Sequence, residues 1–311
     1  MANYIEKKIY YCWFGGEKPK DVLNCINNWK EKLPDYEIIE INEYNKELFN
    51  VEEECQNNLW FKTVYENKLW AFVSDYARLK VLYENGGVYF DTDITVEKDI
   101  TVLLEKNKLV LGWENPIALN IAVGVFITKN KNCLLKQMLE FYDEQIWKSK
   151  LYTIPQIVTY VIRENYNLLP ANQITENDDI LILPQEYFYP IPIGLQIKEF
   201  QKTMFVTPQT YTVHWNSGNW EASDLNNGRD YFLKNKHRIP LEKLLKYCFE
   251  KRIIFDNLFL QIEKYCQLYK IRINLYWIFR FKYKSDYKNN RWLVLFIFGI
   301  PFKIWKMYRG N

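Results

Sequence analysis

Four polar residues in one stretch of the chain have the types and spacing to bind a charged ligand. Asp75 and Arg78 lie three residues apart in a segment whose apolar residues recur at helical spacing, so both side chains leave one helix face. Asp91 and Asp93 follow the apolar run Val88–Phe90, which is typical of a buried strand. Two residues apart in extended chain, the carboxylates point to one side. They repel each other, and a divalent cation that also binds diphosphate relieves the repulsion.

The elements around these residues are expected to bring them together. A helix is predicted from Lys68 to Asn85, and Gly86-Gly87 ends it with a sharp turn into the strand. Open α/β sheets bind their ligands at the carboxyl ends of strands. A lone Asp-x-Asp is common in turns, and a lone Asp/Arg pair is usually a surface ion pair. Because one short turn joins the two pairs here, the combination favours a functional site.

The order of elements at the start of the chain indicates the fold class. Lys8–Phe14 and Tyr36–Ile41 have strand patterns, and Pro19–Leu33 between them has a helical pattern. Strand, helix and strand in this order predict a parallel, doubly wound α/β sheet. Further strands are predicted at Leu109–Trp113, Ile121–Thr128 and Tyr211–Trp215, and further helices at Leu134–Trp147 and Pro155–Arg163.

Charge is divided unevenly along the chain. The net charge of the 311 residues is +3, but from Gln267 to Asn311 ten Lys or Arg accompany one acid, Asp286. The acidic remainder excludes a uniformly basic nucleic-acid binder, and we expect no nucleic acid as partner. The same tail holds thirteen aromatic residues, a composition typical of segments that lie at an anionic membrane surface. Packing against the preceding domain or in a dimer contact stays open as an alternative for the tail.

Cysteine spacing and hydropathy bear on metal centres, location and domains. The six cysteines show no CxxC spacing, which argues against zinc and iron–sulfur sites. Met1–Lys8 lacks the apolar core of a signal peptide, and no uncharged run reaches the roughly 18 residues of a spanning helix. We therefore expect a cytoplasmic protein, peripheral on the inner face of the cell membrane.

A catalytic domain at 1–238 and a helical, basic-aromatic region at 239–311 are predicted.

Several of these motifs resemble one known family. Ser74-Asp75-x-x-Arg78, followed by Gly86-Gly87-x-Tyr89-x-Asp91-x-Asp93, resembles the signature of glycosyltransferases with a DXD sugar-binding region, glycosyltransferase family 32. That group includes bacterial capsular polysaccharide transferases, the yeast initiating mannosyltransferase and, more distantly, the clostridial glucosylating toxins. Further similar blocks are Ile9–Gly16, Tyr152–Gln156 and Tyr211–Trp220, so the resemblance spans about two thirds of the chain.

The resemblance implies a GT-A, Rossmann-like fold and a role for each matching residue. It implies a nucleotide-sugar donor, Mn²⁺ or Mg²⁺ as cofactor, and transfer with retention of anomeric configuration. Trp13 would flank the nucleobase, and Asp75 and Arg78 would hold hydroxyls of the donor sugar. Asp91 would contact ribose and sugar, and Asp93 would ligate the metal.

The last block departs from the family pattern, which commonly reads His-His-aromatic-x-x-Ser-Trp. Here His214 is kept, Trp215 replaces the second histidine, and Asn219 takes the serine position. The metal ligands other than Asp93 are therefore open, with His214 and Asn219 as first candidates and Ser217 as a substitute that would also contact the donor. The final residue of the block, Trp220, is expected to close over the donor as a lid, with a place in the core as an equal alternative.

The expected function is that of a retaining, metal-dependent hexosyltransferase. The donor is expected to be UDP-linked galactose or glucose, and the acceptor a lipid-linked oligosaccharide in capsular or other surface-polysaccharide synthesis. No carboxylate stands out as a covalent nucleophile, so the family suggests front-face displacement in which the leaving diphosphate assists deprotonation of the acceptor. Two alternatives remain. The first is a toxin-like transferase that glycosylates a protein. The second is a non-catalytic, membrane-associated sugar-binding protein whose acids only hold a cation.

Overall fold

The computed structural model describes most of the first 217 residues and three later strands. The described residues are 4–115, 120–147, 149, 151, 153–166, 172–192, 195, 197–217, 279–285, 291–297 and 300–307. The chain divides into two compact units, the first formed by residues 1–147 and 151–236. Each unit is described by itself.

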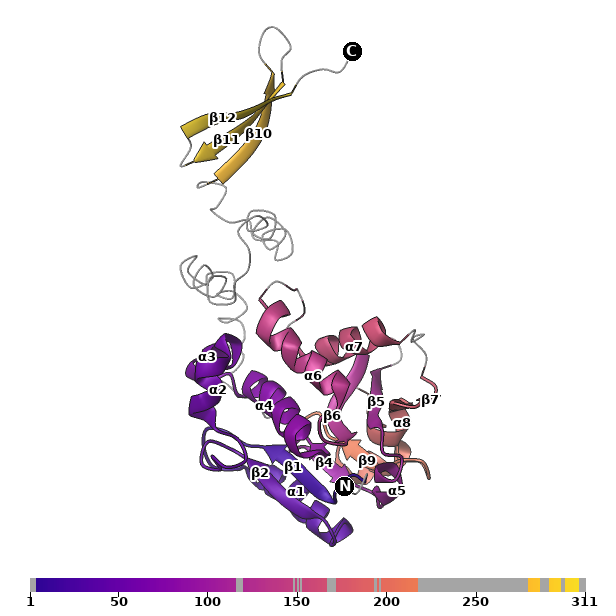
Figure 1. The fold of residues 1–311 in the computed structure, drawn as a ribbon. Coiled ribbons are helices and arrows are strands. Elements are labelled where there is room, and N and C mark those ends of the chain that lie inside the picture. The colour runs from indigo at the N-terminus through magenta and orange to yellow at the C-terminus, as the bar shows by residue number, and fades with distance from the viewer. Residues whose placement is uncertain are drawn as a thin grey trace. The chain divides into compact units, whose positions relative to one another are not determined.

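A seven-stranded mixed sheet is the centre of the first unit (Figure 1). In spatial order its strands are β2 (Glu37–Ile41), β1 (Lys8–Cys12), β3 (Gly87–Phe90), β6 (Asn120–Thr128), β5 (Leu109–Asn115), β8 (Ile180–Leu183) and β7 (Thr175–Glu176). The pairs β2–β1, β1–β3 and β5–β8 are parallel, whereas β6 runs antiparallel to both β3 and β5. This arrangement confirms the α/β fold class.

The prediction of a parallel sheet is confirmed for only part of the sheet. It holds for β1, β2 and β3, because a crossover helix, α1 (Lys20–Lys32), joins β1 to β2. β6 begins only a few residues after β5 ends. Parallel neighbours need a long crossover, so two strands that follow each other this closely pair antiparallel.

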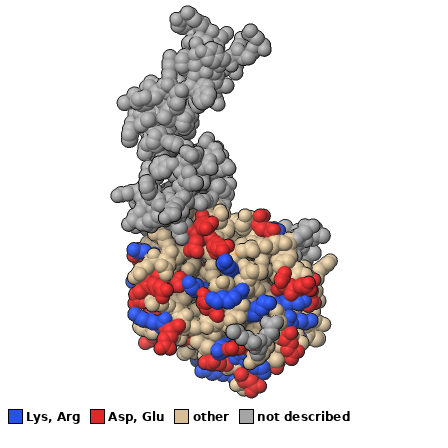
Figure 2. Space-filling model, in the orientation of Figure 1, with Lys and Arg blue, Asp and Glu red and all other residues tan. Residues whose placement is uncertain are grey.

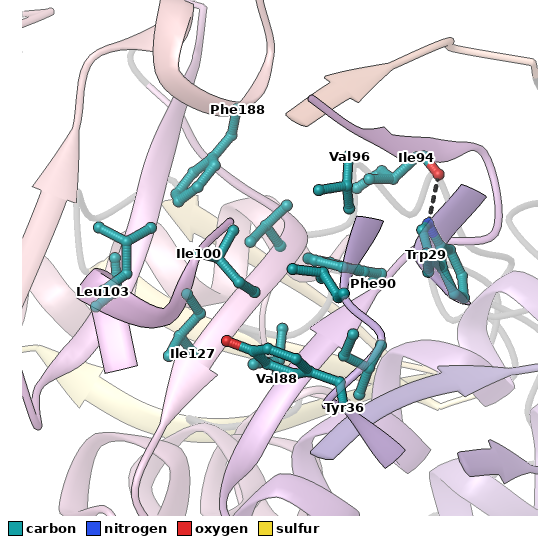
Figure 3. Packing of buried hydrophobic residues seen from close by; sticks show 14 of the residues in the cluster. Trp29, Tyr36, Val88, Phe90, Ile94, Val96, Ile100, Leu103, Ile127 and Phe188 are labelled. Carbon is teal, nitrogen blue, oxygen red and sulfur yellow. Dashed lines mark hydrogen bonds between the residues drawn. The ribbon is translucent and has the colours of Figure 1, made fainter. Parts of the chain in front are cut away.

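Helices cover both faces of the sheet. The α1 side is packed by buried apolar residues that include Val88, Phe90 and Trp29, whose indole donates a 2.7 Å hydrogen bond to the Ile94 carbonyl (Figure 3). The other side carries α4 (Trp70–Asn85), which contacts β1 and β3, together with α6 (Cys133–Glu140) and α7 (Ile154–Asn165).

The remaining helices are short. They are α2 (Val51–Asn57), α3 (Leu59–Glu66), α5 (Thr101–Leu104), a π-helical segment (Phe141–Gln145), α8 (Gln185–Phe188) and a 3₁₀ helix (Glu199–Met204). The predicted helix Leu134–Trp147 is thus α-helical only to Glu140 and continues as the π-helical turn. None of the described helices is both long and apolar enough to span a membrane.

A two-stranded sheet beside the main one positions the last predicted block. β4 (Ile94–Val96) pairs antiparallel with β9 (Thr212–His214), and Ile94 lies opposite His214. The Asn28 side chain holds β4 from the other side, since it accepts from the Val96 amide at 2.6 Å and donates to the Val96 carbonyl at 3.3 Å. Chain segments about 120 residues apart are therefore brought together directly after Asp93.

The second unit contains an antiparallel sheet of β10 (Phe279–Ser285), β11 (Arg291–Ile297) and β12 (Ile300–Met307). The prediction of a helical region is wrong over these residues. Basic and aromatic residues alternate with period two through Phe279–Ser285, which is a strand pattern rather than a helical one. The rest of 239–311 lies outside the described residues, and the domain boundary at 238 stays a prediction.

Candidate active site

Arg78 joins two of the other residues singled out in the sequence, Asp75 and Asp91. Its side chain leaves α4 and is buried. Nη2 lies 3.1 Å from Oδ1 of Asp75, and Nη1 lies 3.0 Å from Oδ1 of Asp91. Nη1 also donates to the Val123 carbonyl at 2.9 Å, and Nε donates to the Ser74 carbonyl at 3.2 Å. One guanidinium therefore fixes a helix, the end of β3 and the adjacent strand β6 to one another.

Tyr89 supports this arrangement from β3. The pleat of the strand turns Val88 and Phe90 toward the α1 side and Tyr89 toward α4. The guanidinium carbon of Arg78 lies 4.4 Å from the Tyr89 ring centroid, a cation–π contact. The Tyr89 hydroxyl donates to Oδ1 of Asp91 at 3.2 Å. The same oxygen of Asp91 thus has two partners.

Two glycines make the close approach possible. Gly86 ends α4 at a φ of 70°, and a Cβ there would lie 2.6 Å from the Asn130 amide nitrogen. The chain can therefore turn from α4 into β3 only with glycine at this point. On β6, a Cβ on Gly124 would lie 3.0 Å from Oδ2 of Asp91. Glycine there leaves the second oxygen of Asp91 unobstructed.

Asp75 is buried, and its pKa reflects that. Burial raises the pKa of its carboxyl to about 7, while the charge of Arg78 works in the opposite direction and nearby Asp91 adds to the increase. The Ile154 amide at the start of α7 also donates to this carboxyl. Near neutral pH both protonation states are populated, so the group can accept or donate a hydrogen bond to a sugar hydroxyl.

Asp93 and His214 form a second cluster. His214 Nε2 lies 3.0 Å from Oδ1 of Asp93, and the Ser217 amide donates to Oδ2 at 2.9 Å. Burial works to raise the pKa of Asp93, but the His214 charge and the hydrogen bonds outweigh it and hold that pKa below its usual value. Burial works to lower the pKa of His214, but the Asp93 charge outweighs it and raises that pKa to about 9.

These two side chains fit a divalent metal. Ligands about 2.1 Å from an octahedral metal are roughly 3.0 Å apart when adjacent, the observed separation of Asp93 Oδ1 and His214 Nε2. His214 must lose its proton to act as a ligand, so the metal would replace the imidazolium charge beside Asp93. Within the described part of the chain no three His, Cys, Asp or Glu side chains are grouped to hold a metal. Diphosphate oxygens would have to supply further ligands.

The other predicted site residues are placed less directly. Trp13 follows β1; its amide donates to the Ile41 carbonyl at 3.0 Å and its indole to the Gly16 carbonyl at 2.9 Å. It therefore lies at the carboxyl ends of β1 and β2. Ser217 contributes its backbone amide to Asp93, and its side chain is exposed. Asn219 and Trp220 lie outside the described residues.

The sequence interpretation missed one carboxylate, Glu114. It is the penultimate residue of β5, and its charge acts on His214 together with the charges of Asp93 and Asp91. Burial raises the pKa of Glu114. The available signal was an acid placed directly after the predicted strand Leu109–Trp113, at a strand end like Asp91.

Two stretches of the chain match known families. Residues 19–110 match the family described as "Glycosyltransferase sugar-binding region containing DXD motif", and residues 131–237 match "Alpha 1,4-glycosyltransferase conserved region". The first stretch holds Asp75, Arg78, Asp91 and Asp93, and the second holds His214. Both models describe glycosyltransferases, and the chain is a glycosyltransferase.

This glycosyltransferase also has curated relatives. The lactosylceramide 4-alpha-galactosyltransferase of Pongo pygmaeus is 28% identical over 171 residues, which are 50% of this chain and 74% of that protein. The Homo sapiens protein of the same name is also 28% identical over 171 residues, covering 50% of this chain and 46% of that protein. Inositol phosphoceramide mannosyltransferase 1 of Schizosaccharomyces pombe is 29% identical over 118 residues, or 36% of this chain and 35% of that protein.

Among solved structures, a galactosyltransferase in complex with donor and acceptor sugar analogues matches with a TM-score of 0.41 and 12% identity. The match covers 72% of this chain and 94% of that one. The chain spans about half the length, or less, of several of its curated relatives. Its donor, acceptor and membrane partner are therefore matters for proposal.

Proposed function

We propose that this glycosyltransferase transfers a hexose, with retention of configuration, from a UDP-sugar to a glycan carried on a lipid. The observation that carries the proposal is the Arg78 network, which holds Asp75 and Asp91 at the end of β3, beside the Asp93–His214 pair. Hydroxyl-binding groups and a diphosphate-binding metal site then lie next to each other. A nucleotide sugar needs both, because its sugar hydroxyls and its diphosphate are neighbours along the molecule.

The donor sugar would be held by the acids of the Arg78 network. Arg78 and Tyr89 both bind Oδ1 of Asp91, so Oδ2, beside Gly124, is the oxygen left to accept a bond from a sugar or ribose hydroxyl. Asp75 accepts or donates as its protonation requires. Because Arg78 is anchored by two backbone carbonyls as well, the geometry is set before the donor arrives.

A bound Mn²⁺ or Mg²⁺ would offset the charge that develops on the departing diphosphate. Asp93 and His214 would hold it, with Asn219 as a further candidate ligand. The Ser217 amide fixes the orientation of the Asp93 carboxylate through Oδ2. Trp13 is proposed to flank the base and Trp220 to close over the donor, so that water is excluded from the site.

The sugar and the acceptor are proposed from the relatives. Two of the proteins compared are named as transferring galactose or mannose to ceramide lipids. We therefore favour UDP-galactose as donor, UDP-glucose next, and a lipid-linked oligosaccharide as acceptor. The motif resemblance to bacterial capsular transferases suggests a precursor of capsular or other surface polysaccharide.

A membrane-surface location would suit such an acceptor. Residues 267–311 carry ten Lys or Arg and one acid, and each basic residue near an anionic leaflet contributes about 1 kcal/mol. In contrast, acidic and basic side chains are interspersed on the face of the first unit shown in Figure 2. We propose that the basic tail attaches the protein to the cytoplasmic face of an anionic membrane.

The proposal is tested by incubating the full chain with UDP-galactose, UDP-glucose and GDP-mannose, with MnCl₂ or with EDTA. Free nucleoside diphosphate is measured, first without acceptor and then with lactose or vesicles that contain lactosylceramide. We expect Mn²⁺-dependent release from a UDP-sugar that increases when a glycan acceptor is added. Absence of release from every donor would contradict the proposal, and release that only an added protein stimulates would favour protein glycosylation.

A further inference from the structure

Strand β6 is irregular where it passes the site. Val110 of β5 lies opposite Ile127 of β6, and Gly112 lies opposite Ala122, so β5 advances by two residues where β6 advances by five. The backbone groups of this stretch of β6 cannot all pair with β5, and buried backbone groups need other partners. Bulges of this kind occur next to active sites.

Two buried side chains bind the backbone of the bulge. Nη1 of Arg78 donates to the Val123 carbonyl at 2.9 Å. The Val125 amide donates to the hydroxyl oxygen of Tyr189 at 2.8 Å. Tyr189 follows the short helix α8, and its side chain is buried. It is therefore a second side chain, after Arg78, that fixes this part of β6.

The ring of Tyr189 lies between the bulge and the second cluster of the site. A Cβ on Gly112 would lie 3.0 Å from this ring, and a Cβ on Gly124 would lie 3.4 Å from it, so both strands have glycine where the ring packs. The ring packs against the imidazole of His214, with centroids 5.8 Å apart and the two planes at 89°. One side chain thus connects β5, β6 and His214.

The orientation of His214 depends on its neighbours. Without a metal, Nε2 lies 3.0 Å from Oδ1 of Asp93. Once Nε2 binds a metal it has no proton to share with Asp93, so that hydrogen bond no longer orients the ring. The contact with Tyr189 does not depend on this proton. It is the contact that can keep the imidazole plane fixed in both states.

We propose that Tyr189 is a positioning residue for the metal site. Its ring holds the imidazole of His214 in the orientation that a ligand needs, and its hydroxyl holds the ring to β6. This inference rests on the proposed function, in which Asp93 and His214 bind Mn²⁺ together with the diphosphate. The alternative is a core tyrosine that contributes to stability alone, since buried tyrosine hydroxyls usually have a hydrogen-bond partner.

The test is a calorimetric titration of the full chain with Mn²⁺ in the presence of UDP, with a titration of UDP alone as reference. The proteins are the wild type, Tyr189→Phe and the matched control Tyr36→Phe. Tyr36 belongs to the same buried cluster (Figure 3), and its hydroxyl also has one hydrogen bond, 3.0 Å from Oγ1 of Thr101.

The two substitutions should affect metal binding differently. Loss of a group that orients a metal ligand weakens metal affinity by about 10- to 100-fold. We expect the Kd for Mn²⁺ to increase at least tenfold in Tyr189→Phe and to stay within twofold of wild type in Tyr36→Phe. Thermal unfolding should show similar losses of stability in both, because each loses one hydroxyl hydrogen bond.

A double-mutant cycle shows whether Tyr189 acts through His214. His214→Gln removes the ring that Tyr189 contacts, and its side-chain oxygen can still bind Mn²⁺. Adding Tyr189→Phe to His214→Gln should then change the Kd for Mn²⁺ by less than twofold. A tenfold increase in both backgrounds would overturn the inference, because Tyr189 would then act independently of His214.

The remaining results overturn the inference in ways that can be told apart. An unchanged Kd for Mn²⁺ in a folded Tyr189→Phe protein excludes the positioning role. An equal increase in Tyr36→Phe assigns the loss to general loosening of the core. If the wild type with UDP binds no Mn²⁺ beyond the UDP reference, the metal site of the proposed function fails, and this inference fails with it.

Discussion

Nη1 of Arg78 lies 3.0 Å from Oδ1 of Asp91, and this ion pair connects helix α4 to the end of strand β3. Along the chain, the end of α4, the Gly86-Gly87 turn and the four-residue strand β3 lie between the two residues. The pair fixes the carboxylate of Asp91, the first acid of the DXD segment, before any ligand is present. Its consequences for stability and activity are measurable.

Arg78→Met should cost both stability and activity. Removing the guanidinium leaves Asp75 and Asp91 without their cation, and breaking a buried pair in this way costs about 3–5 kcal/mol. Chemical denaturation measures that loss, and hydrolysis of the donor should fall with it. The matched control is Lys62→Met, in an exposed pair with Glu66, for which a loss of about 0.5 kcal/mol or less is expected. Equal effects of the two substitutions would show that the network contributes little.

Asp75 should impose a specific pH dependence on stability. Its carboxyl has a pKa of about 7 in the folded chain against 3.8 unfolded. Between these values the folded state binds the extra proton, so the contribution of Asp75 is fully present below about pH 4 and is lost as pH rises through 7. The difference in unfolding free energy between wild type and Asp75→Asn should therefore decrease over this window, by at most about 1.4 kcal/mol per pH unit. A constant difference, or an increasing one, would contradict this assignment.

Gly124→Ala tests the space beside Asp91. The added methyl would lie 3.0 Å from Oδ2 of Asp91 and 3.3 Å from the Ile94 side chain. The carboxylate has to shift, and misplacement of a positioning group lowers turnover by about ten- to a hundredfold. We expect that decrease in kcat/KM for UDP-sugar hydrolysis. Thermal unfolding is the companion measurement, since wild-type activity in a folded Gly124→Ala protein would remove Oδ2 from donor binding.

The tail can be tested in the full-length chain. Lys282, Lys284 and Lys303 lie in β10 and β12 and are replaced together by Gln. If the tail binds an anionic membrane, the triple variant should lose about 3 kcal/mol of binding to phosphatidylserine vesicles. Co-sedimentation of the wild type should weaken as salt increases. Salt-independent binding that is equal in both proteins would favour packing of the tail within the protein instead.

The convergence of the Arg78 network was accessible from sequence because its signals are local. Asp75 and Arg78 share a helix face, a glycine turn follows, and Asp91 ends the next strand. The structure brings these three together as expected, and also brings His214 to Asp93 by pairing β9 with β4. Their catalytic roles stay predictions.

Long-range pairing was not accessible in the same way. The antiparallel placement of β6 between β3 and β5 depends on which strands meet, and apolar runs such as Ile121–Thr128 carry no signal of direction. Glu114 was missed for a related reason. Its relevance comes from its charge acting on His214, which is distant in sequence.

The measurement that tests the central claim most directly compares Asp93→Asn with Asp99→Asn in Mn²⁺-dependent release of UDP from UDP-galactose. Asp99 is exposed and accepts a 2.8 Å hydrogen bond from the Thr101 amide at the start of α5, which an asparagine side chain can also accept. We predict that Asp99→Asn retains wild-type release. Asp93→Asn should lose nearly all of it while unfolding at a similar temperature. Full Mn²⁺-dependent release by a folded Asp93→Asn protein would contradict the metal site at the Asp93–His214 pair.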